Sequence, residues 1–368
     1  MGSSSSRSIP NYDARIRTKN GEKFRISYHD LVDHILLLRK VIAHPEITQE
    51  GPLLDYFVND YCNRMARQEM QTRDQQMKLP WQTEWIWHVH RLHPLNYQAD
   101  CTKQLLNEQI VDKKVRQLLH KHKSNQDSKL SFPSITNRFF FVPTIDLRKA
   151  VIRQRDFLEK FQKHYLYSLD LKKFLRSQFE NLVQNYISFM KLAQKNEMIV
   201  PTFDIDVIWH THMRYPSQYQ TVSIALCGFI VDHNDDIESN NLNNAYEKTA
   251  ERWEKTYKSK YGYTIDRKTV ETSQYMSSCA LVFVPVFISS GSGASSCGAM
   301  GGGCGSGCGG GGCDAGGGGS CGGGGGGGCD GGGGGGGGCG GGGGGCGGGG
   351  GGGGCGGGGC GGGGCGGD

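Results

Sequence analysis

Apolar residues recur with helical spacing along most of the first 260 residues, and this periodicity predicts a mainly α-helical protein. Several of the periodic stretches begin or end next to a proline, which is typical of helix boundaries. The predicted helices cover residues 31–42, 52–65, 104–123, 146–165, 169–195 and 242–260.

A small β component is expected beside these helices. Short alternating runs flank Asn20-Gly21, a pair typical of tight β-turns, so residues 15–26 are predicted to form a hairpin. Residues 139–142 predict a short strand. The apolar run 280–288 is far shorter than the roughly 20 residues that a membrane-spanning helix needs, and it predicts a buried strand.

Composition divides the chain into a body and a tail. Of 60 glycines, 55 lie in residues 291–368, together with eleven of the fifteen cysteines. A segment so poor in apolar side chains cannot offset its chain entropy, so the Gly/Cys-rich tail is predicted to be disordered. With a polar break after residue 124, the expected organisation is a flexible N-terminus, two duplicated helical subdomains and the tail, over residues 1–14, 15–125, 139–290 and 291–368.

Charge is concentrated in the body, because all 40 lysines and arginines lie at or before Lys268. A mildly basic body suits an anionic membrane surface or an acidic protein partner. The tail lacks the arginines and aromatic residues that single-strand binders use, so nucleic acid is not expected to bind there. Without an apolar secretory segment at the start, the body cysteines are expected to be free thiols in the cytoplasm.

The first residues match an N-myristoylation site. Gly2 follows the initiator Met1, small serines follow Gly2, and Ser6 occupies the position where the motif has Ser or Thr. One acyl chain gives only marginal membrane binding, so a second, basic signal would be needed. We therefore expect lipidation at Gly2 and peripheral contact with the cytoplasmic face of a membrane.

An internal repeat links two distant Trp-His-x-His segments. The two copies align at a constant offset, with an acidic residue three positions before each tryptophan, at Glu84 and Asp206. The matched residues are Trp87, His88, His90, Pro94 and Tyr97 in the first copy and Trp209, His210, His212, Pro216 and Tyr219 in the second. This spacing predicts duplication of a helical subdomain, with two halves related by a pseudo-twofold axis.

Each acidic residue lies four positions before a histidine, so a helix would place the two on one face. Glu84 would then orient His88, and Asp206 would orient His210. The expected role is a buried structural network, since most such pairs are structural. The alternative is a zinc site or zinc hydrolase with ligands from both halves, joined by His93 or His233; the histidines considered as ligands are His88, His90, His210 and His212.

Three stretches resemble the glycine-rich domain-containing proteins, of which plants have well-known members. The stretches are 145–157, with Ile145-Asp146-Leu147, 200–212, which ends in Trp209-His210-Thr211-His212, and 84–92. The resemblance covers about residues 28–290 and the tail. It implies a helical repeat module linked to growth and stress responses, with RNA binding suggested for some members, and it brings no catalytic residues. The chain departs from the longer members in its length.

These observations together predict a non-enzymatic regulatory or adaptor protein with protein partners, tethered by myristate. The alternatives are a metal-binding protein or metal-dependent hydrolase, and an RNA-associated protein.

Overall fold

The computed structural model describes residues 8–18, 21, 23–124, 141–262, 276–277 and 279–282. Gly2, the residues after 124 proposed as a boundary, and the tail 291–368 lie outside the described residues. The elements up to residue 124 are β1 (Asp13–Arg17), β2 (Lys23–Ser27), α1 (Tyr28–Ala43), the 3₁₀ helix η1 (Pro45–Thr48), α2 (Pro52–Ala66), α3 (Arg73–Met77), α4 (Trp81–Arg91), α5 (Pro94–Gln104) and α6 (Gln117–Ser124). The later elements are α7 (Leu147–Lys163), α8 (Tyr165–Ser168), α9 (Arg176–Met190), α10 (Phe203–Met213), α11 (Pro216–Cys227), β3 (Asp232–Asn234), α12 (Ser239–Tyr257) and β4 (Ala280–Val282).

The mainly helical class is therefore confirmed, with two small antiparallel sheets, β1–β2 and β3–β4. The predicted hairpin and the amphipathic helices α1, α2, α7 and α12 appear close to their predicted positions. Their apolar stripes are buried in one hydrophobic core that extends through both halves. Burial of these stripes rather than helix propensity accounts for most of their stability.

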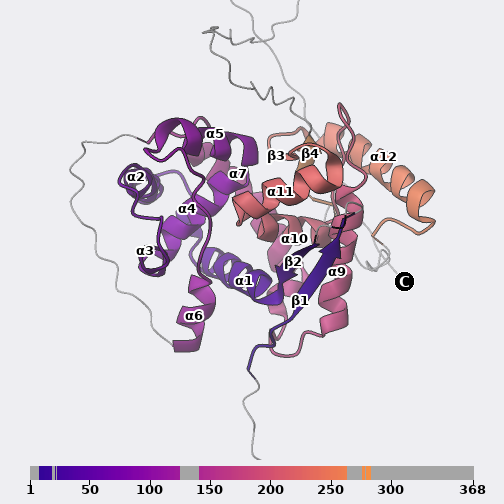
Figure 1. The fold of residues 1–368 in the computed structure, drawn as a ribbon, viewed down its shortest axis with the longest axis horizontal. Coiled ribbons are helices and arrows are strands. Elements are labelled where there is room, and N and C mark those ends of the chain that lie inside the picture. Colours follow the sequence, from indigo (N-terminus) through magenta and orange to yellow (C-terminus); the bar gives the residue numbers. More distant parts are fainter. Residues whose placement is uncertain are drawn as a thin grey trace, which may run out of the picture. The chain divides into compact units, whose positions relative to one another are not determined.

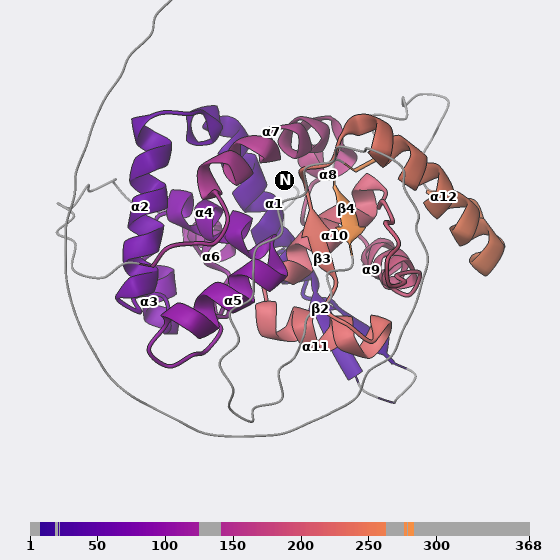
Figure 2. The same ribbon diagram turned by 90° about the horizontal axis from the view of Figure 1, so that it is seen from above.

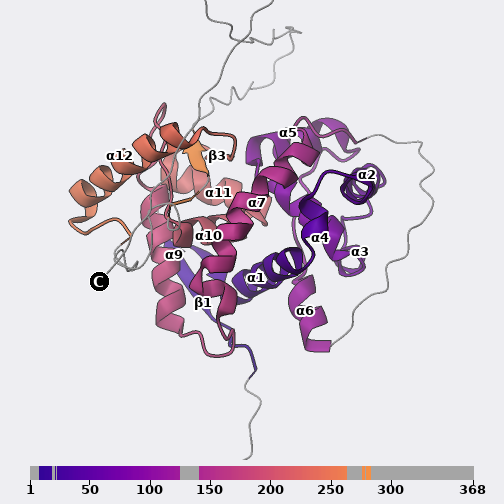
Figure 3. The ribbon, with the colours of Figure 1, turned by 180° about the vertical axis from the view of Figure 1, so that it is seen from behind.

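The two halves exchange elements across the core. Helices α2–α6 gather on one side and α9–α12 on the other, with α1 and α7 between them (Figures 1 and 2). Helix α7 follows the predicted boundary in sequence, yet it packs against α2 and α4, as the view from behind also shows (Figure 3). Conversely, α1 packs against α10 and strand β1 packs against α9.

Helices α4 and α10 have the same length and the same ending. Each is 11 residues long and is followed after a sharp bend by a helix that begins with proline, Pro94 or Pro216. The bend residues are nearly superimposable in backbone angles: φ −113° and ψ 75° at His93, and φ −117° and ψ 74° at Tyr215. A proline in the first turn suits this corner because its missing N–H would have no helical partner.

The same hydrogen bonds recur in both copies. Trp87 Nε1 donates to the Tyr97 hydroxyl over 2.9 Å, and that hydroxyl donates to the Val111 carbonyl over 2.7 Å. In the second copy, the indole of Trp209 and the hydroxyl of Tyr219 form the corresponding bonds, 3.0 and 2.7 Å long, and the second ends on the Val231 carbonyl.

A reciprocal contact joins the two copies. Asp112 of the first half accepts a hydrogen bond of 2.9 Å from the Ser217 N–H at the start of α11. Asp232 of the second half accepts from the Leu95 N–H at the start of α5. Each carboxylate therefore satisfies a free backbone donor at the start of the other half's helix.

Two predicted elements differ from the structure. The helix predicted over 104–123 is confined to α6, because the segment before it pairs its backbone with side chains. The side chain of Gln76 accepts from the N–H of Lys114 over 2.7 Å and donates to the carbonyl of Asp112 over 2.8 Å. The predicted helix over 169–195 is likewise shortened to α9.

In the described part of the strand predicted over 139–142, Phe141 and Val142 belong to no strand. The side-chain amide of Gln104 pairs with both the N–H and the carbonyl of Val142, each over 2.8 Å. A backbone satisfied by one side chain has no need of a neighbouring strand. Of the run predicted over 280–288, the described residues form β4.

Within the described residues, no helix combines the length and the apolar character needed to cross a bilayer.

Candidate metal centre

Two of the four residues at the candidate centre lie on helix α10. Asp206 and His210 are one turn apart on the same face, and His210 Nε2 lies 3.1 Å from Asp206 Oδ1. Both side chains are only 1% exposed. This is the carboxylate–imidazole pair that the spacing of the second Trp-His segment predicted.

The other two residues come from the sheet beside α10. Strand β3 carries His233, which is paired with Leu281 of β4, and Cys279 immediately precedes β4. A bridge between Ile199 and Leu281 attaches the same strand to the segment before α10. The backbone of this small sheet thus brings side chains far apart in sequence to one point.

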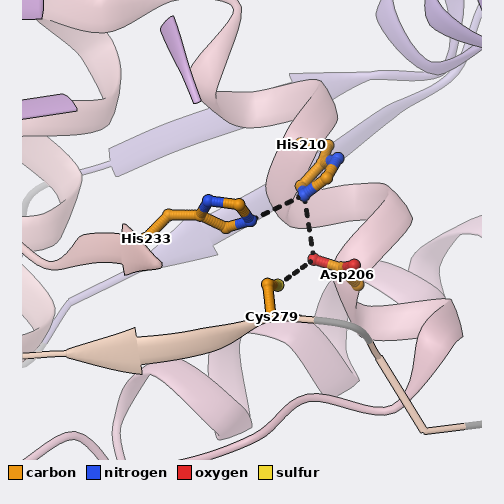
Figure 4. Close-up of side chains that lie close together, drawn as sticks. All are labelled: Asp206, His210, His233 and Cys279. Carbon is orange, nitrogen blue, oxygen red and sulfur yellow. Dashed lines mark hydrogen bonds and ion pairs between the residues drawn. The ribbon is translucent and has the colours of Figure 1, made fainter. Parts of the chain in front are cut away.

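The four side chains converge on one another (Figure 4). His210 Nε2 lies 2.9 Å from His233 Nε2, and Cys279 Sγ lies 3.3 Å from Asp206 Oδ1. One ligand atom from each residue falls within 4.8 Å of the other three. Ligand atoms around a tetrahedral zinc ion are about 3.3–3.5 Å apart, given Zn–N bonds near 2.0 Å and Zn–S bonds near 2.3 Å. Three of the observed separations, 2.9, 3.1 and 3.3 Å, are close to these values.

Neighbouring side chains fix the orientation of each group. Ser277 donates its hydroxyl to Asp206 Oδ2 over 2.6 Å, which leaves Oδ1 directed at the centre. The ring of Phe157 stacks on His210 at 4.5 Å between centroids, and the Trp209 ring lies 5.0 Å from that of His233. Such supporting contacts are typical of residues that hold metals.

The local electrostatics favour the protonation states in which Asp206 and His233 can bind a metal. Burial raises the pKa of Asp206, but His210 and His233 outweigh burial and lower it overall, so the carboxylate is ionised. Burial, followed by the nearby His210, lowers the pKa of His233 to about 3, which keeps its ring neutral with a free lone pair.

The thiol is the exception. Burial, and then the Asp206 carboxylate, raise the pKa of Cys279 well above its usual value. A bound cation would reverse this, because a thiol that coordinates a metal is deprotonated. The four groups can therefore act together as ligands when a cation supplies the missing positive charge.

The remaining histidines of the two segments lie elsewhere. His90 Nδ1 is hydrogen-bonded to the Tyr61 hydroxyl over 2.7 Å, and His212 Nδ1 is hydrogen-bonded to the Tyr186 hydroxyl over 2.8 Å. His88 is fully buried with its ring 4.8 Å from that of His34, and neither of its nitrogens has a hydrogen-bond partner among the described residues. Of the four histidines considered as metal ligands, His210 is the one that the structure brings into this group.

The expected bond between Glu84 and His88 does not form. Glu84 Oε1 instead accepts from Lys113 over 2.8 Å, Arg214 over 3.0 Å and Arg91 over 3.1 Å. Three cations outcompete a neutral imidazole for one buried carboxylate, since bonds between charged groups are roughly twice as strong. Asp33 is the second carboxylate in this network, and its Oδ2 lies 2.7 Å from the Arg214 guanidinium.

The sequence reasoning missed Cys279 and Arg214. Cys279 was treated as an ordinary body thiol, although its place directly before an apolar strand marks it as facing the core. Arg214 stands at the end of α10 outside the repeated pattern, where its offset partner is Leu92. Neither residue shows a local signal of what it contacts.

Comparison with known proteins supports the resemblance that the sequence motifs indicated. The family model described as Glycine-rich domain-containing protein-like matches residues 102–222, which include Asp206 and His210. Glycine-rich domain-containing protein 1 of Arabidopsis thaliana is 28% identical over 212 residues, covering 50% of this chain and 25% of the relative. Glycine-rich domain-containing protein 2 of the same plant is 28% identical over 210 residues, covering 50% of this chain and 26% of the relative.

The chain thus spans about a quarter of the length of the curated relatives that it matches. No solved structure matches it. The family match and these two relatives confirm the resemblance of this chain to the glycine-rich domain-containing proteins.

Proposed function

We propose that this chain is a non-enzymatic adaptor whose second half is stabilised by a structural zinc ion held by Asp206, His210, His233 and Cys279. The observation that carries the proposal is the convergence of four buried ligand atoms of different types. Two of the side chains are 1% exposed, His233 is 2% exposed and Cys279 is 3% exposed.

The ligand types favour zinc over other cations. Two imidazoles, a thiolate and a carboxylate are ligands of zinc, whereas calcium and magnesium take oxygen ligands. A zinc site with four protein ligands is typically structural, and a catalytic zinc keeps a position for water or substrate. Four buried ligands therefore support a stabilising role over the alternative of a metal-dependent hydrolase.

Metal analysis of the purified full chain tests this proposal. The eleven tail cysteines can also bind soft metals, so the measurement is a difference between variants. Cys279→Ser is expected to remove one equivalent of zinc, while Cys227→Ser, which changes a body thiol outside the centre, is expected to remove none. Cobalt substitution would report the same loss through its absorption spectrum.

Stability provides a second measurement. With free zinc at about a hundred times its dissociation constant, binding stabilises the folded chain by about 2.7 kcal/mol. A chelator should therefore lower the melting temperature of the wild type and of Cys227→Ser, but not that of Cys279→Ser. Equal metal content in all three proteins, with no chelator effect, would exclude a zinc site at this position.

The adaptor part of the proposal rests on sequence. Gly2 and the serines after it suit myristoylation, which would place the body at the cytoplasmic face of a membrane within reach of protein partners. Mass spectrometry of the N-terminal peptide of protein expressed in eukaryotic cells tests this, and an unmodified glycine or a retained Met1 would remove the lipid anchor.

We also infer that the two halves arose by duplication of a helical subdomain. The matched bends at His93 and Tyr215 and the matched Trp–Tyr hydrogen bonds support this inference.

A further inference from the structure

The outer face of the N-terminal hairpin carries four cations in two opposed pairs. In β1, Arg15 and Arg17 are exposed, while the alternate residues Ala14 and Ile16 are buried. In β2, Lys23 and Arg25 are exposed. All four exposed side chains therefore lie on one face of the ribbon, because neighbouring residues in a strand point to opposite faces.

The strand register places like charges directly opposite each other. Arg15 pairs with Arg25, and Arg17 pairs with Lys23. Like charges at opposed positions destabilise a sheet. Among the described residues, Asp13 provides a carboxylate on this face, 3.4 Å from the Arg25 guanidinium, which is itself 74% exposed. Four cations facing one carboxylate leave this face strongly positive.

We propose that this hairpin face binds the surface of an anionic membrane. The positive charge is spread over a two-stranded ribbon rather than focused in a cleft, which matches the diffuse negative potential of a leaflet rich in phosphatidylserine. Nucleic acid is a poorer match, because single strands are bound through exposed aromatic rings, whereas the outward positions of this face hold Arg, Lys and Asp13. The proposal is independent of zinc at the metal centre.

The hollow beside the hairpin does not alter this assignment. It has a volume of about 480 Å³ and lies between β1 and α9, where Asp13 and Arg15 meet Arg176 and Glu180. Its two acidic and two basic groups balance, and Arg176 already contacts Glu180 over 3.0 Å. The excess positive charge thus belongs to the outer face of the ribbon.

Vesicle co-sedimentation tests the proposal with full-length protein made in bacteria, which carries no acyl chain. The protein should sediment with phosphatidylcholine vesicles that contain phosphatidylserine, and not with phosphatidylcholine alone. Each lysine or arginine near such a surface strengthens partitioning about fivefold, so the four together contribute roughly a few hundred-fold. Raising the salt from about 0.05 M to about 0.5 M should abolish binding.

A quadruple variant identifies the face. Arg15→Gln, Arg17→Gln, Lys23→Gln and Arg25→Gln together should reduce partitioning about a hundredfold or more. A matched control removes the same charge from four exposed lysines in α12 and just after it, and it should keep most of the binding; these are Lys248, Lys255, Lys258 and Lys260.

Folding of the hairpin variant is checked by thermal melting. Because the substitutions remove opposed like charges, the melting temperature should stay equal or rise. If that variant is less stable, the double variant Arg17→Gln and Lys23→Gln gives the same test, with about a 25-fold loss expected. The proposal is overturned if the wild type ignores phosphatidylserine, if it prefers RNA or an acidic peptide to vesicles, or if the α12 control loses as much binding as the hairpin variant.

Discussion

The two Trp-His segments share one backbone frame, meaning the helix–bend–helix geometry and the Trp–Tyr hydrogen bonds, but their buried carboxylates have different partners. In the first, the carboxylate of Glu84 is surrounded by three cations and is part of an internal salt-bridge network. In the second, Asp206 faces two imidazoles and a thiol. In each half an aspartate follows the matched valine, Val111 or Val231, and the next residue is Lys113 in the first half and His233 in the second.

This difference teaches that the backbone frame and the partners of the buried carboxylate are determined by different residues. The Trp–Tyr hydrogen bonds and the proline-initiated helices are the same in both halves, so they hold the frame. Burial raises the pKa of Glu84, but Lys113, Arg91 and Arg214 lower it overall, and a carboxylate so well paired with cations cannot also bind a metal. In the second half, His233 stands where the first half has Lys113, and Met213 stands where it has Arg91, so the second carboxylate is open to a cation.

The largest expected effect comes from removing the carboxylate of the first half. Glu84→Gln leaves Lys113, Arg91 and Arg214 buried with Asp33 as their remaining acid, so we expect a loss of about 3–5 kcal/mol in the free energy of unfolding. Urea unfolding at pH 7 with a chelator present measures it.

The matched substitution in the second half is Asp206→Asn, which breaks hydrogen bonds but strands no permanent cation. Under the same metal-free conditions its expected cost is about 1–2 kcal/mol. Equal losses of stability in the two variants would show that the two carboxylates contribute equally to folding, which would contradict the difference described between the two halves.

A smaller effect should appear in the pH dependence of stability. His90 is bonded through Nε2 to Asp100 over 3.0 Å, but His212 Nε2 has no partner among the described residues, since Val222 stands at the matching position. Burial lowers the pKa of His212 to about 3, against about 6.5 in the unfolded chain. The unfolded chain therefore takes up a proton first, and stability is full above pH 6.5 and falls as the pH drops toward 3.

Between pH 6.5 and pH 4 this one histidine should remove roughly 2–3 kcal/mol. His212→Asn, which keeps an acceptor for Tyr186, is expected to flatten that part of the pH profile. His90→Asn should flatten it less, because Asp100 opposes the effect of burial on the pKa of His90. The measurement is the free energy of unfolding in urea, determined from pH 7 to pH 4 for each protein. A steeper fall of this free energy with decreasing pH in His212→Asn than in the wild type would contradict the prediction.

The smallest effect tests the shared frame. Tyr97→Phe and Tyr219→Phe each remove a hydroxyl that receives one hydrogen bond and donates another, so each should cost about 1–2 kcal/mol. Because the geometry is matched, the two losses should agree within about 0.5 kcal/mol, and their double variant should be additive. A large difference between them, measured by urea unfolding, would weaken the case for equivalent halves.

Local patterns predicted local structure well. The apolar stripe of α1, the long amphipathic α7 and the Asn20-Gly21 hairpin were all recognisable, because each is determined by residues within one or two turns of one another. The prediction failed between α5 and α6, where the backbone is satisfied by the distant side chain of Gln76. No periodicity within that segment records such a contact.

The candidate site was predictable only in its helical part. The four-residue spacing predicted a pair between Asp206 and His210, and this pair forms. The same spacing predicted a pair between Glu84 and His88, which does not form. The outcome depended on Arg91 at the end of the same helix, and on Lys113 and Arg214, which approach from other segments. Cys279, more than 70 positions after Asp206 in sequence, is brought to the centre by the pairing of β4 with β3.

The position of Arg214 in the chain has a consequence for synthesis on the ribosome. Its guanidinium bridges Asp33 and Glu84, two carboxylates that leave the exit tunnel long before it. A nascent chain that lacks this arginine holds those acids against Lys113 and Arg91 alone. The first half therefore cannot reach its final arrangement until Arg214 has also left the exit tunnel, which requires translation beyond codon 214.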